Sequence, residues 1–373
     1  MNKIKDIIVI YPSFEKGGAT VNLINFINQC VKKKINTHLI SNISRAKKKN
    51  FFLKNVILVS NKKFRNIYSN RFLTSIISIF FLISLFKKIR SKNSIVISFQ
   101  SHLLPIIFCR LFNRKIIIRN SEDILDATKY ADNKISAYFI FLLKVFVYNF
   151  SNGIITNSVK AKKSLDIITL KHKTKMIYNP YLKKIFNNKN YKRNNVILSV
   201  GRLCKQKNQI IAIKAFSVFL KKFPNYKLVL IGHGKDELIL KNLCKELKIT
   251  KKVIFKGWVP KPATYYKSSK ILIFPSLYEG LPNTLIEAVN YNLPCISSRC
   301  SGAEDILTLK YGTFITKNSY YHLSEKMIDS ISNYQKILLK NKIIKKKLNR
   351  FLINTQVLKY INYCNNISFN LDK

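Results

Sequence analysis

The chain has 373 residues, of which 67 are lysine or arginine and 17 are aspartate or glutamate, so its formal net charge is +50. This length exceeds one ordinary α/β domain and suits two, each with its own core. The basic residues comprise 56 lysines and 11 arginines spread along the whole chain, whereas a nucleic-acid site concentrates arginine and interleaved aromatic residues. We therefore expect no nucleic-acid partner, although so positive a surface would attract an anionic membrane surface.

Short apolar runs alternate with helical patterns through the first half. A strand pattern at 6–10 leads through a Gly-Gly turn into a helical pattern at 19–31. Further strand-like runs are THLIS at 37–41, VILVS at 56–60, SIVIS at 94–98, KIIIR at 115–119 and GIITN at 153–157. Strands that alternate with helices predict a parallel sheet covered on both faces.

Two longer apolar stretches lie in this half, at 72–86 and 138–150. Each is shorter than the ~20 residues of a bilayer span and is flanked by basic residues. We interpret both as helices of a soluble domain; the alternative is that one lies in the membrane surface with its apolar face in the lipid.

The N-terminus and the cysteines bear on the compartment. The chain starts directly with a strand pattern and lacks the cleavage site of a signal peptide. Its seven cysteines have no zinc or redox spacing, which favours buried thiols in a reducing compartment. We expect a cytoplasmic protein, peripheral at the inner face of the cytoplasmic membrane if its apolar helices engage lipid.

The alternating pattern restarts after a polar segment at 181–195, which we interpret as a linker between domains. The second set of strand-like runs is NVILSVG at 195–201, KLVLIG at 227–232, VIFKG at 253–257, ILIFPS at 271–276 and PCISS at 294–298. In doubly wound domains, ligands bind outside the carboxyl ends of such strands. The tail from 335 to 365 has helical periodicity.

Several familiar nucleotide-binding motifs are missing. No Asp-x-Asp pair and no Gly-x-x-x-x-Gly-Lys-Ser/Thr loop occurs, which argues against a metal-held nucleotide diphosphate and against a P-loop NTPase. The Gly232-His233-Gly234 run lacks the third glycine of a dinucleotide fingerprint.

The segment YEGLPNTLIEAV at 278–289 follows a strand and carries Glu279 and Glu287, with Pro282 placed to start a helix at Asn283. Ionised carboxylates accept strong hydrogen bonds from sugar hydroxyls. The alternative is that both glutamates are ordinary surface charges.

The segment GRLCKQKN at 201–208 ends another strand and places Arg202 and Lys207 beside the start of a helix. Two cations beside a helix N-terminus can form a diphosphate site.

These segments, with LVLIGHGKDELILKNLCKEL, VIFKGWVPKPATYYKSSKILIFPS and SGAEDIL, resemble the donor domain of the retaining glycosyltransferases of family 4, also called glycosyltransferase group 1. The resemblance covers roughly 195–307 and is looser in the N-terminal half, where EKGGATVNLINF at 15–26 carries it. It implies the GT-B fold: α/β, with two Rossmann-like doubly wound domains facing a cleft and C-terminal helices returning to the N-terminal domain. The domains would be 1–185 for the acceptor, 186–345 for the nucleotide sugar, and 346–373 as a helical tail.

The resemblance also implies site residues. Arg202 and Lys207 would neutralise the donor diphosphate, Glu279 would bind the transferred sugar and Glu287 the ribose. Backbone groups of the loops at Gly280, Leu281, Asn283, Gly302 and Ala303, and of Gly17 and Gly18 in the other domain, would contact the substrates. His102 aligns with a family histidine near the sugar, the alternative being a core or surface histidine, and Arg119 is a candidate for the acceptor or the cleft. Where the family has a glycine before the next strand, this chain has Asn292, which tolerates left-handed geometry and so preserves the turn.

The resulting functional expectation is metal-independent transfer of a hexose, with retention, from a UDP- or GDP-sugar to a lipid-linked or cell-envelope glycan. UDP-N-acetylhexosamine is the donor we favour, with no cofactor and no metal. The rivals are a basic protein that binds membrane or nucleic acid through its lysines, and an inactive glycosyltransferase-like subunit.

Overall fold

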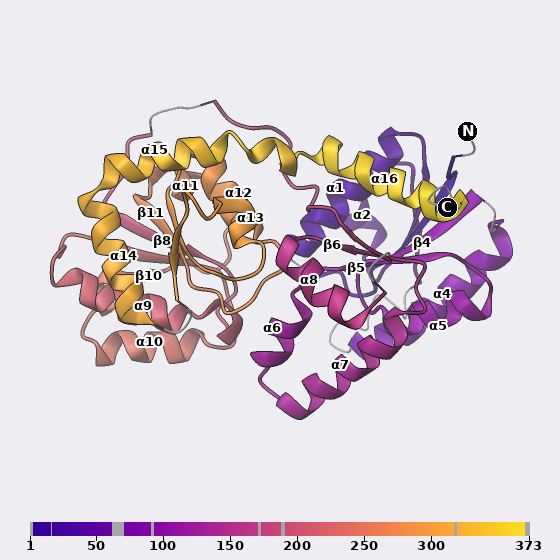
Figure 1. The fold of residues 1–373 in the computed structure, drawn as a ribbon, viewed down its shortest axis with the longest axis horizontal. Coiled ribbons are helices and arrows are strands. Elements are labelled where there is room, and N and C mark those ends of the chain that lie inside the picture. The colour runs from indigo at the N-terminus through magenta and orange to yellow at the C-terminus, as the bar shows by residue number, and fades with distance from the viewer. Residues whose placement is uncertain are drawn as a thin grey trace. The chain divides into compact units, whose positions relative to one another are not determined.

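The computed structural model describes residues 3–15, 17–61, 71–90, 93–170, 173–187, 191–316 and 319–369. Three segments predicted from the sequence lie partly outside these residues. The parts outside are Lys16 beside the Gly-Gly turn, 188–190 in the linker and 370–373 in the tail. The chain divides into two compact units (Figure 1). Unit 1 comprises Met1–Lys183 and Phe351–Lys373, and unit 2 comprises Lys184–Arg350.

Unit 1 is built on a seven-stranded parallel sheet with the order β3-β2-β1-β4-β5-β6-β7. Its strands are β1 (Asp6–Ile10), β2 (Asn36–Ile40), β3 (Val56–Val59), β4 (Ser94–Ser98), β5 (Ile116–Asn120), β6 (Gly153–Thr156) and β7 (Thr174–Met176). The first six confirm the strand predictions. The sequence pattern missed β7, which has only three residues and one fully buried position.

Helices cover both faces of this sheet, as the continuous apolar strands require. One face packs against α1 (Gly18–Lys32) through side chains such as Leu23 and Phe26. The other face packs against three helices through side chains such as Leu82, Ile106 and Val147. These helices are α4 (Arg71–Lys88), α5 (Leu103–Leu111) and α7 (Lys134–Tyr148). The remaining helices of this part of the chain are α2 (Arg45–Phe51), α6 (Ile124–Lys129) and α8 (Val159–Ile168).

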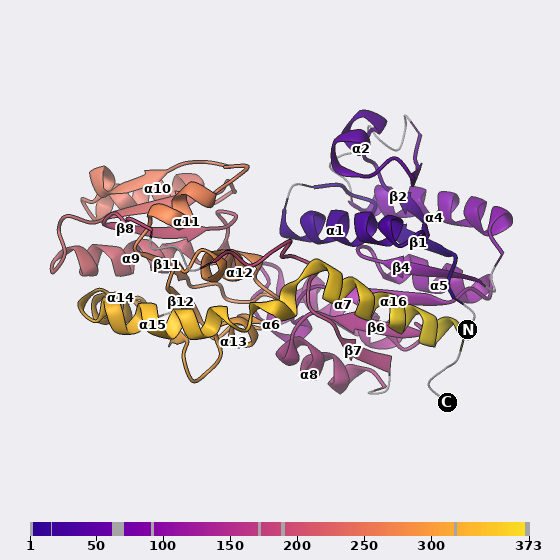
Figure 2. The ribbon, with the colours of Figure 1, turned by 90° about the horizontal axis from the view of Figure 1, so that it is seen from above.

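The chain returns to unit 1 at its C-terminus, as the fold prediction has it. Helix α16 (Ile353–Phe369) lies against α1 (Figure 1 and Figure 2). Its Val357, Tyr360 and Cys364 are buried in the same core cluster as Phe26. The terminal helix therefore completes the core of the N-terminal half.

Unit 2 has a six-stranded parallel sheet with the order β10-β9-β8-β11-β12-β13. Its strands are β8 (Val196–Val200), β9 (Lys227–Ile231), β10 (Val253–Phe255), β11 (Ile271–Phe274), β12 (Cys295–Ser298) and β13 (Thr313–Ile315). The first five confirm the predictions, and the three-residue β13 was missed. Its α-helices are α9 (Gln209–Leu220), α10 (Glu237–Glu246), α11 (Ala263–Ser268), α12 (Asn283–Asn290), α13 (Ala303–Leu307), α14 (Tyr320–Ser332) and α15 (Tyr334–Lys345). Together the two units confirm two Rossmann-like doubly wound domains.

The two apolar stretches both form helices, α4 and α7, as predicted. Over the described residues, no helix combines the length and the apolar character that a membrane crossing needs. No disulfide joins any of the seven cysteines, all of which lie in the described ranges, and all but Cys204 are buried. Burial raises the pKa of the Cys244 thiol to about 11, so this thiol stays protonated near neutral pH.

Candidate active site

The candidate site of unit 2 lies where the direction of the strand order reverses. From β8 the chain moves outward through β9 and β10, and β11 then returns to the other side of β8. Such a switch point leaves a crevice outside the carboxyl ends of the two central strands, which is where doubly wound sheets bind ligands. The loops that follow β8 and β11 are 201–208 and 275–282, which contain five of the predicted site residues.

Gln206 ties these two loops together. Its backbone oxygen accepts from Leu277 N at 2.8 Å, and its side-chain amide donates to Tyr278 O at 3.0 Å. Its side-chain oxygen also accepts from Arg202 Nη2 at 3.0 Å. Gln206 thereby connects Arg202 to the loop that carries Glu279. Sequence reasoning quoted Gln206 within its motif but assigned it no role, because its amide carries no charge to suggest one.

Lys207 and Glu279 form an ion pair between the same two loops. Glu279 is 9% exposed, and Lys207 Nζ also lies 5.1 Å from the centre of the Phe274 ring. A largely buried carboxylate needs such a partner, because an unpaired buried charge is costly. The structure thus brings together two predicted site residues that lie 72 positions apart in the chain.

Glu287 lies on α12, in the second turn after Pro282, the residue that precedes the helix. Its Oε2 accepts a hydrogen bond of 2.6 Å from the hydroxyl of Tyr266 on α11. Tyr266 is buried and its ring stacks on Tyr291, with centroids 5.8 Å apart and an interplanar angle of 12°. Packing therefore fixes the hydroxyl that orients this carboxylate. Tyr266 is a second residue that sequence reasoning missed.

Two glycines are required because neighbouring loops of the site touch. Gly302, which precedes α13 and Ala303, has φ +76, and a Cβ there would lie 2.3 Å from Gly280 O and 2.8 Å from Leu281 Cα. Gly232 has φ +139, and a Cβ there would lie 1.9 Å from Gly201 O. Both backbones are left-handed and closely packed, so a side chain would displace the loops that carry Arg202 and Glu279.

In unit 1 the strand order reverses between β1 and β4. The Gly-Gly turn follows β1: Gly17 is extended (φ 164) with nothing within 4 Å of a Cβ, and Gly18 starts α1. His102 follows β4 and its Nδ1 lies 2.9 Å from Ser98 Oγ. Burial, with smaller effects of Lys144 and Arg119, lowers the pKa of His102 to about 3, so the imidazole is neutral at physiological pH.

Arg119, at the end of β5, is 1% exposed. Its Nε donates to Tyr360 Oη at 3.1 Å and its Nη2 to Asn179 Oδ1 at 2.6 Å, while Nη1 donates to Ser121 Oγ. These bonds connect the sheet to α16 and support a structural role. Its assignment to substrate binding stays a prediction.

The described residues contain no cluster of three or more His, Cys, Asp or Glu side chains arranged to hold a metal ion. The charged groups that gather at the switch point of unit 2 are Arg202, Lys207 and Glu279, linked through Gln206. Two cations next to one carboxylate can hold a diphosphate and, beside it, a group with hydroxyl donors.

Comparison with known proteins relates this part of the chain to a family. Residues 182–350 match the family model of glycosyl transferases group 1. The capsular polysaccharide biosynthesis glycosyltransferase CapH of Staphylococcus aureus is 33% identical over 229 residues, 57% of this chain and 61% of that protein. An alpha-1,4-N-acetyl-D-galactosaminyltransferase of Campylobacter jejuni, named for a diNAcBac-PP-undecaprenol-linked acceptor, is 30% identical over 176 residues, 45% of this chain and 48% of its own.

Among solved structures, Anabaena HepE in complex with UDP and glucose superposes with a TM-score of 0.76 and 16% identity, covering 96% of this chain and all of that one. At this identity the likeness concerns the fold. The chain spans about half the length of the curated relatives it matches first. Residues 182–350 therefore match the glycosyl transferases group 1 family, and the two parallel sheets of the chain are those of the GT-B fold.

Proposed function

We propose that this chain is a retaining, metal-independent glycosyltransferase of family 4 that moves a hexose from a nucleotide sugar to an acceptor hydroxyl. The observation that carries the proposal is the cluster of Arg202, Lys207 and Glu279 at the switch point of a sheet within the segment that matches the group 1 family. Cations placed at a strand end neutralise a departing diphosphate without a metal, and such preorganised charge is usually the largest contribution to catalysis.

Each residue has a distinct role in this proposal. Arg202 and Lys207 bind the diphosphate, and Glu287, oriented by Tyr266, accepts hydrogen bonds from the ribose hydroxyls. Glu279 binds hydroxyls of the transferred sugar. The backbone N–H groups of five residues in unit 2 and those of Gly17 and Gly18 supply further donors for the substrates; the five are Gly280, Leu281, Asn283, Gly302 and Ala303.

The reaction balances without an enzymic nucleophile. The acceptor oxygen bonds to the anomeric carbon on the face from which the diphosphate leaves, as the bond from that carbon to the diphosphate oxygen breaks. The acceptor proton passes to an oxygen of the leaving diphosphate. On this account Arg202 and Lys207 stabilise the negative charge that develops, and the protein otherwise positions the reactants.

For the substrates we propose UDP-N-acetylhexosamine as donor and a lipid-linked or cell-envelope glycan as acceptor. The capsular polysaccharide enzyme and the undecaprenol-linked glycan enzyme named above support the acceptor class. The HepE complexes with UDP and with UDP-glucose support a uridine nucleotide.

A lipid-linked acceptor requires contact with a membrane, and helix α7 supplies a suitable surface in unit 1. Ile135 is 85% exposed, Phe139 62% and Phe146 68%. Helix α7 packs beside α5 (Figure 1), and α5 itself exposes Leu111. Contiguous exposed apolar residues on a basic protein mark an interfacial helix that inserts between anionic lipids. We propose that the chain acts at the inner face of the cytoplasmic membrane through this surface.

The donor site is tested by titrating the protein with UDP in the presence of EDTA and measuring the dissociation constant by calorimetry. Arg202→Ala should weaken binding by about tenfold, as loss of a hydrogen bond to a charged group predicts. Lys205→Ala is the matched control, because Lys205 lies in the same 3-10 turn as Lys207. Equal affinities for both variants and for wild type would contradict the proposal. Nucleic-acid binding that ignores these variants but falls steeply with salt would favour the rival basic-protein function.

The membrane surface is tested by flotation with vesicles that contain anionic lipid. The double variant Phe139→Ser/Phe146→Ser should float less than wild type. The control Leu238→Ser removes a side chain on α10 of unit 2 that is 69% exposed and should float as wild type does. Flotation of the double variant equal to wild type would contradict the assignment to α7.

A further inference from the structure

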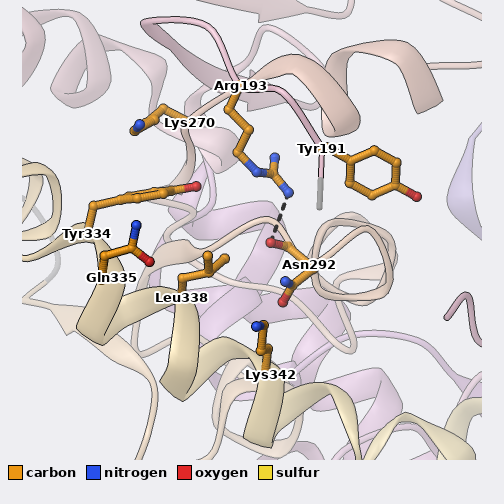
Figure 3. Close-up of a pocket in the computed structure, with 8 residues that line it drawn as sticks. All are labelled: Tyr191, Arg193, Lys270, Asn292, Tyr334, Gln335, Leu338 and Lys342. Atoms are coloured by element: carbon orange, nitrogen blue, oxygen red, sulfur yellow. Dashed lines mark hydrogen bonds between the residues drawn. The ribbon is translucent and has the colours of Figure 1, made fainter. Parts of the chain in front are cut away.

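Unit 2 contains a cavity of about 310 Å³ (Figure 3), which is lined by none of the residues of the candidate active site. Three of its lining residues precede strands: Arg193 comes before β8, Lys270 directly before β11 and Asn292 before β12. The cavity therefore lies at the amino edge of the parallel sheet, whereas Arg202 and Glu279 follow the carboxyl ends of their strands. It belongs to no site described above.

The cavity is lined by three cationic side chains, Arg193, Lys270 and Lys342, and no carboxylate is among its eight lining residues. The guanidinium of Arg193 donates to four main-chain oxygens, at 3.0 Å and 2.7 Å through Nη1 and at 2.9 Å twice through Nη2. These carbonyls fix its position but do not neutralise its charge. Burial lowers the pKa of Arg193, because a charged guanidinium loses hydration there.

Several hydrogen-bond donors face this cavity from α15. Figure 3 shows Lys342, the Gln335 amide and the Tyr334 hydroxyl on one side, with the guanidinium of Arg193 approaching from the other. The Tyr334 hydroxyl is buried beside the guanidinium of Arg193, a group that can only donate. Within the described part of the chain, no group accepts the hydroxyl's own hydrogen. Lys270 Nζ lies 4.2 Å from the centre of the Tyr334 ring, which adds a second positive charge over that ring. A buried hydroxyl whose hydrogen has no acceptor indicates a missing ligand.

We propose that this cavity binds a small phosphate-bearing anion, with Lys342, Gln335 and Tyr334 as donors and with Arg193 and Lys270 supplying further positive charge. A phosphate has several acceptor oxygens and a charge near minus two, so it satisfies the open donors and compensates the cations at once. A neutral ligand would leave the positive charges uncompensated.

The position of the cavity gives such an anion a structural effect. Arg193 belongs to the segment by which the chain enters unit 2, and Lys342 to the helix that precedes its departure at Arg350. The same anion would contact both segments within unit 2. Its binding should therefore stabilise this unit against unfolding, because a ligand that binds only the folded state raises the free energy of unfolding.

The test is thermal unfolding of the full chain in increasing inorganic phosphate, with chloride used to keep the ionic strength constant. Wild type should gain stability with a saturable dependence on phosphate. Lys342→Gln and Tyr334→Phe should each weaken the apparent affinity by about tenfold, as loss of a charged hydrogen bond predicts. Tyr334→Phe keeps the ring that faces Lys270 and removes only the hydroxyl. It therefore tests the proposal even if Lys342→Gln fails to fold.

Two control variants show whether the effect of phosphate arises in this cavity or from cations elsewhere in the chain. Lys336→Gln makes the same change of charge on α15 at an exposed position outside the cavity and should keep the phosphate effect. Arg202→Ala at the candidate active site should keep it too. No saturable stabilisation of wild type by phosphate would overturn the proposal, and so would an effect that Arg202→Ala abolishes or that both cavity variants leave unchanged.

Discussion

Substitution of Gly302 by alanine should separate the two loops that form the candidate active site. A Cβ at this position would lie 2.3 Å from Gly280 O, whereas ordinary contact between heavy atoms is about 3.5 Å. The loops must therefore move apart by about 1 Å. The left-handed backbone at φ +76 adds about 1–2 kcal/mol for a residue with a side chain, and a forced shift in packed structure costs about 1–3 kcal/mol more.

Two measurements check this prediction. Urea unfolding should show a loss of several kcal/mol in the free energy of unfolding of Gly302→Ala, and donor turnover should fall by about a hundredfold, as a misplacement of about 1 Å predicts. Gly17→Ala is the control for stability, since Gly17 is extended and a Cβ there meets nothing within 4 Å. If Gly302→Ala unfolds at the same urea concentration as Gly17→Ala and turns over donor as wild type does, the loop packing described here is wrong.

Three further changes have defined outcomes. Tyr266→Phe should weaken UDP binding by roughly fivefold, because about 1 kcal/mol of orientation is lost at Glu287; calorimetry with Tyr265→Phe as control measures it, and unchanged affinity would refute the role of the hydroxyl. Arg119→Met should lower the free energy of unfolding by about 3 kcal/mol, because its buried partners lose their donors; urea unfolding as stable as wild type would contradict this. Burial lowers the pKa of His102 from 6.5 to about 3, so below pH 6.5 the unfolded chain binds a proton that the folded chain does not, and stability falls as pH drops towards 3. His102→Gln should reduce this dependence in urea unfolding from pH 4 to 7, and an unchanged slope would exclude His102 as its source.

The sequence predicted the fold well because both sheets are parallel. Strands buried on both faces appear as uninterrupted apolar runs, and eleven such runs in the sequence predict strands that the structure confirms. The two missed strands, Thr174–Met176 and Thr313–Ile315, have three residues each and lie at sheet edges, where pairing rather than composition defines them. Asn292 was expected to preserve a turn in place of glycine. Its φ of 54 lies in the left-handed region, which confirms this prediction.

The charged residues of the candidate site were also found in the sequence, but their mutual contacts were not. The ion pair of Lys207 and Glu279 depends on the adjacency of β8 and β11, and spacing along one chain does not reveal which strands are neighbours. The roles of Gln206 and Tyr266 could not be predicted from the sequence for a related reason. Their roles arise from an amide and a hydroxyl held by packing, and neither residue type indicates chemistry without its surroundings.

The two glycines after β9 match part of a dinucleotide-binding motif, but loop packing also explains them. Gly232 and Gly234 suggested part of a dinucleotide fingerprint in the sequence. In the structure a Cβ on Gly232 would meet Gly201 O at 1.9 Å, and one on Gly234 would meet Leu203 O at 2.0 Å. Both glycines are therefore explained by the close approach of the loop after β9 to the loop after β8, which carries Arg202.

The most direct test of the proposed activity is turnover of a panel of UDP- and GDP-sugars in the presence of EDTA, for wild type, Glu279→Gln, Arg202→Ala and the control Lys205→Ala. The product should form without a metal and keep the anomeric configuration of the donor, which NMR of the released sugar reports. We predict turnover of a UDP-sugar by wild type and Lys205→Ala and its loss in the other two variants. Turnover that survives both Glu279→Gln and Arg202→Ala, or no turnover of any donor by wild type, would contradict the assignment of this site.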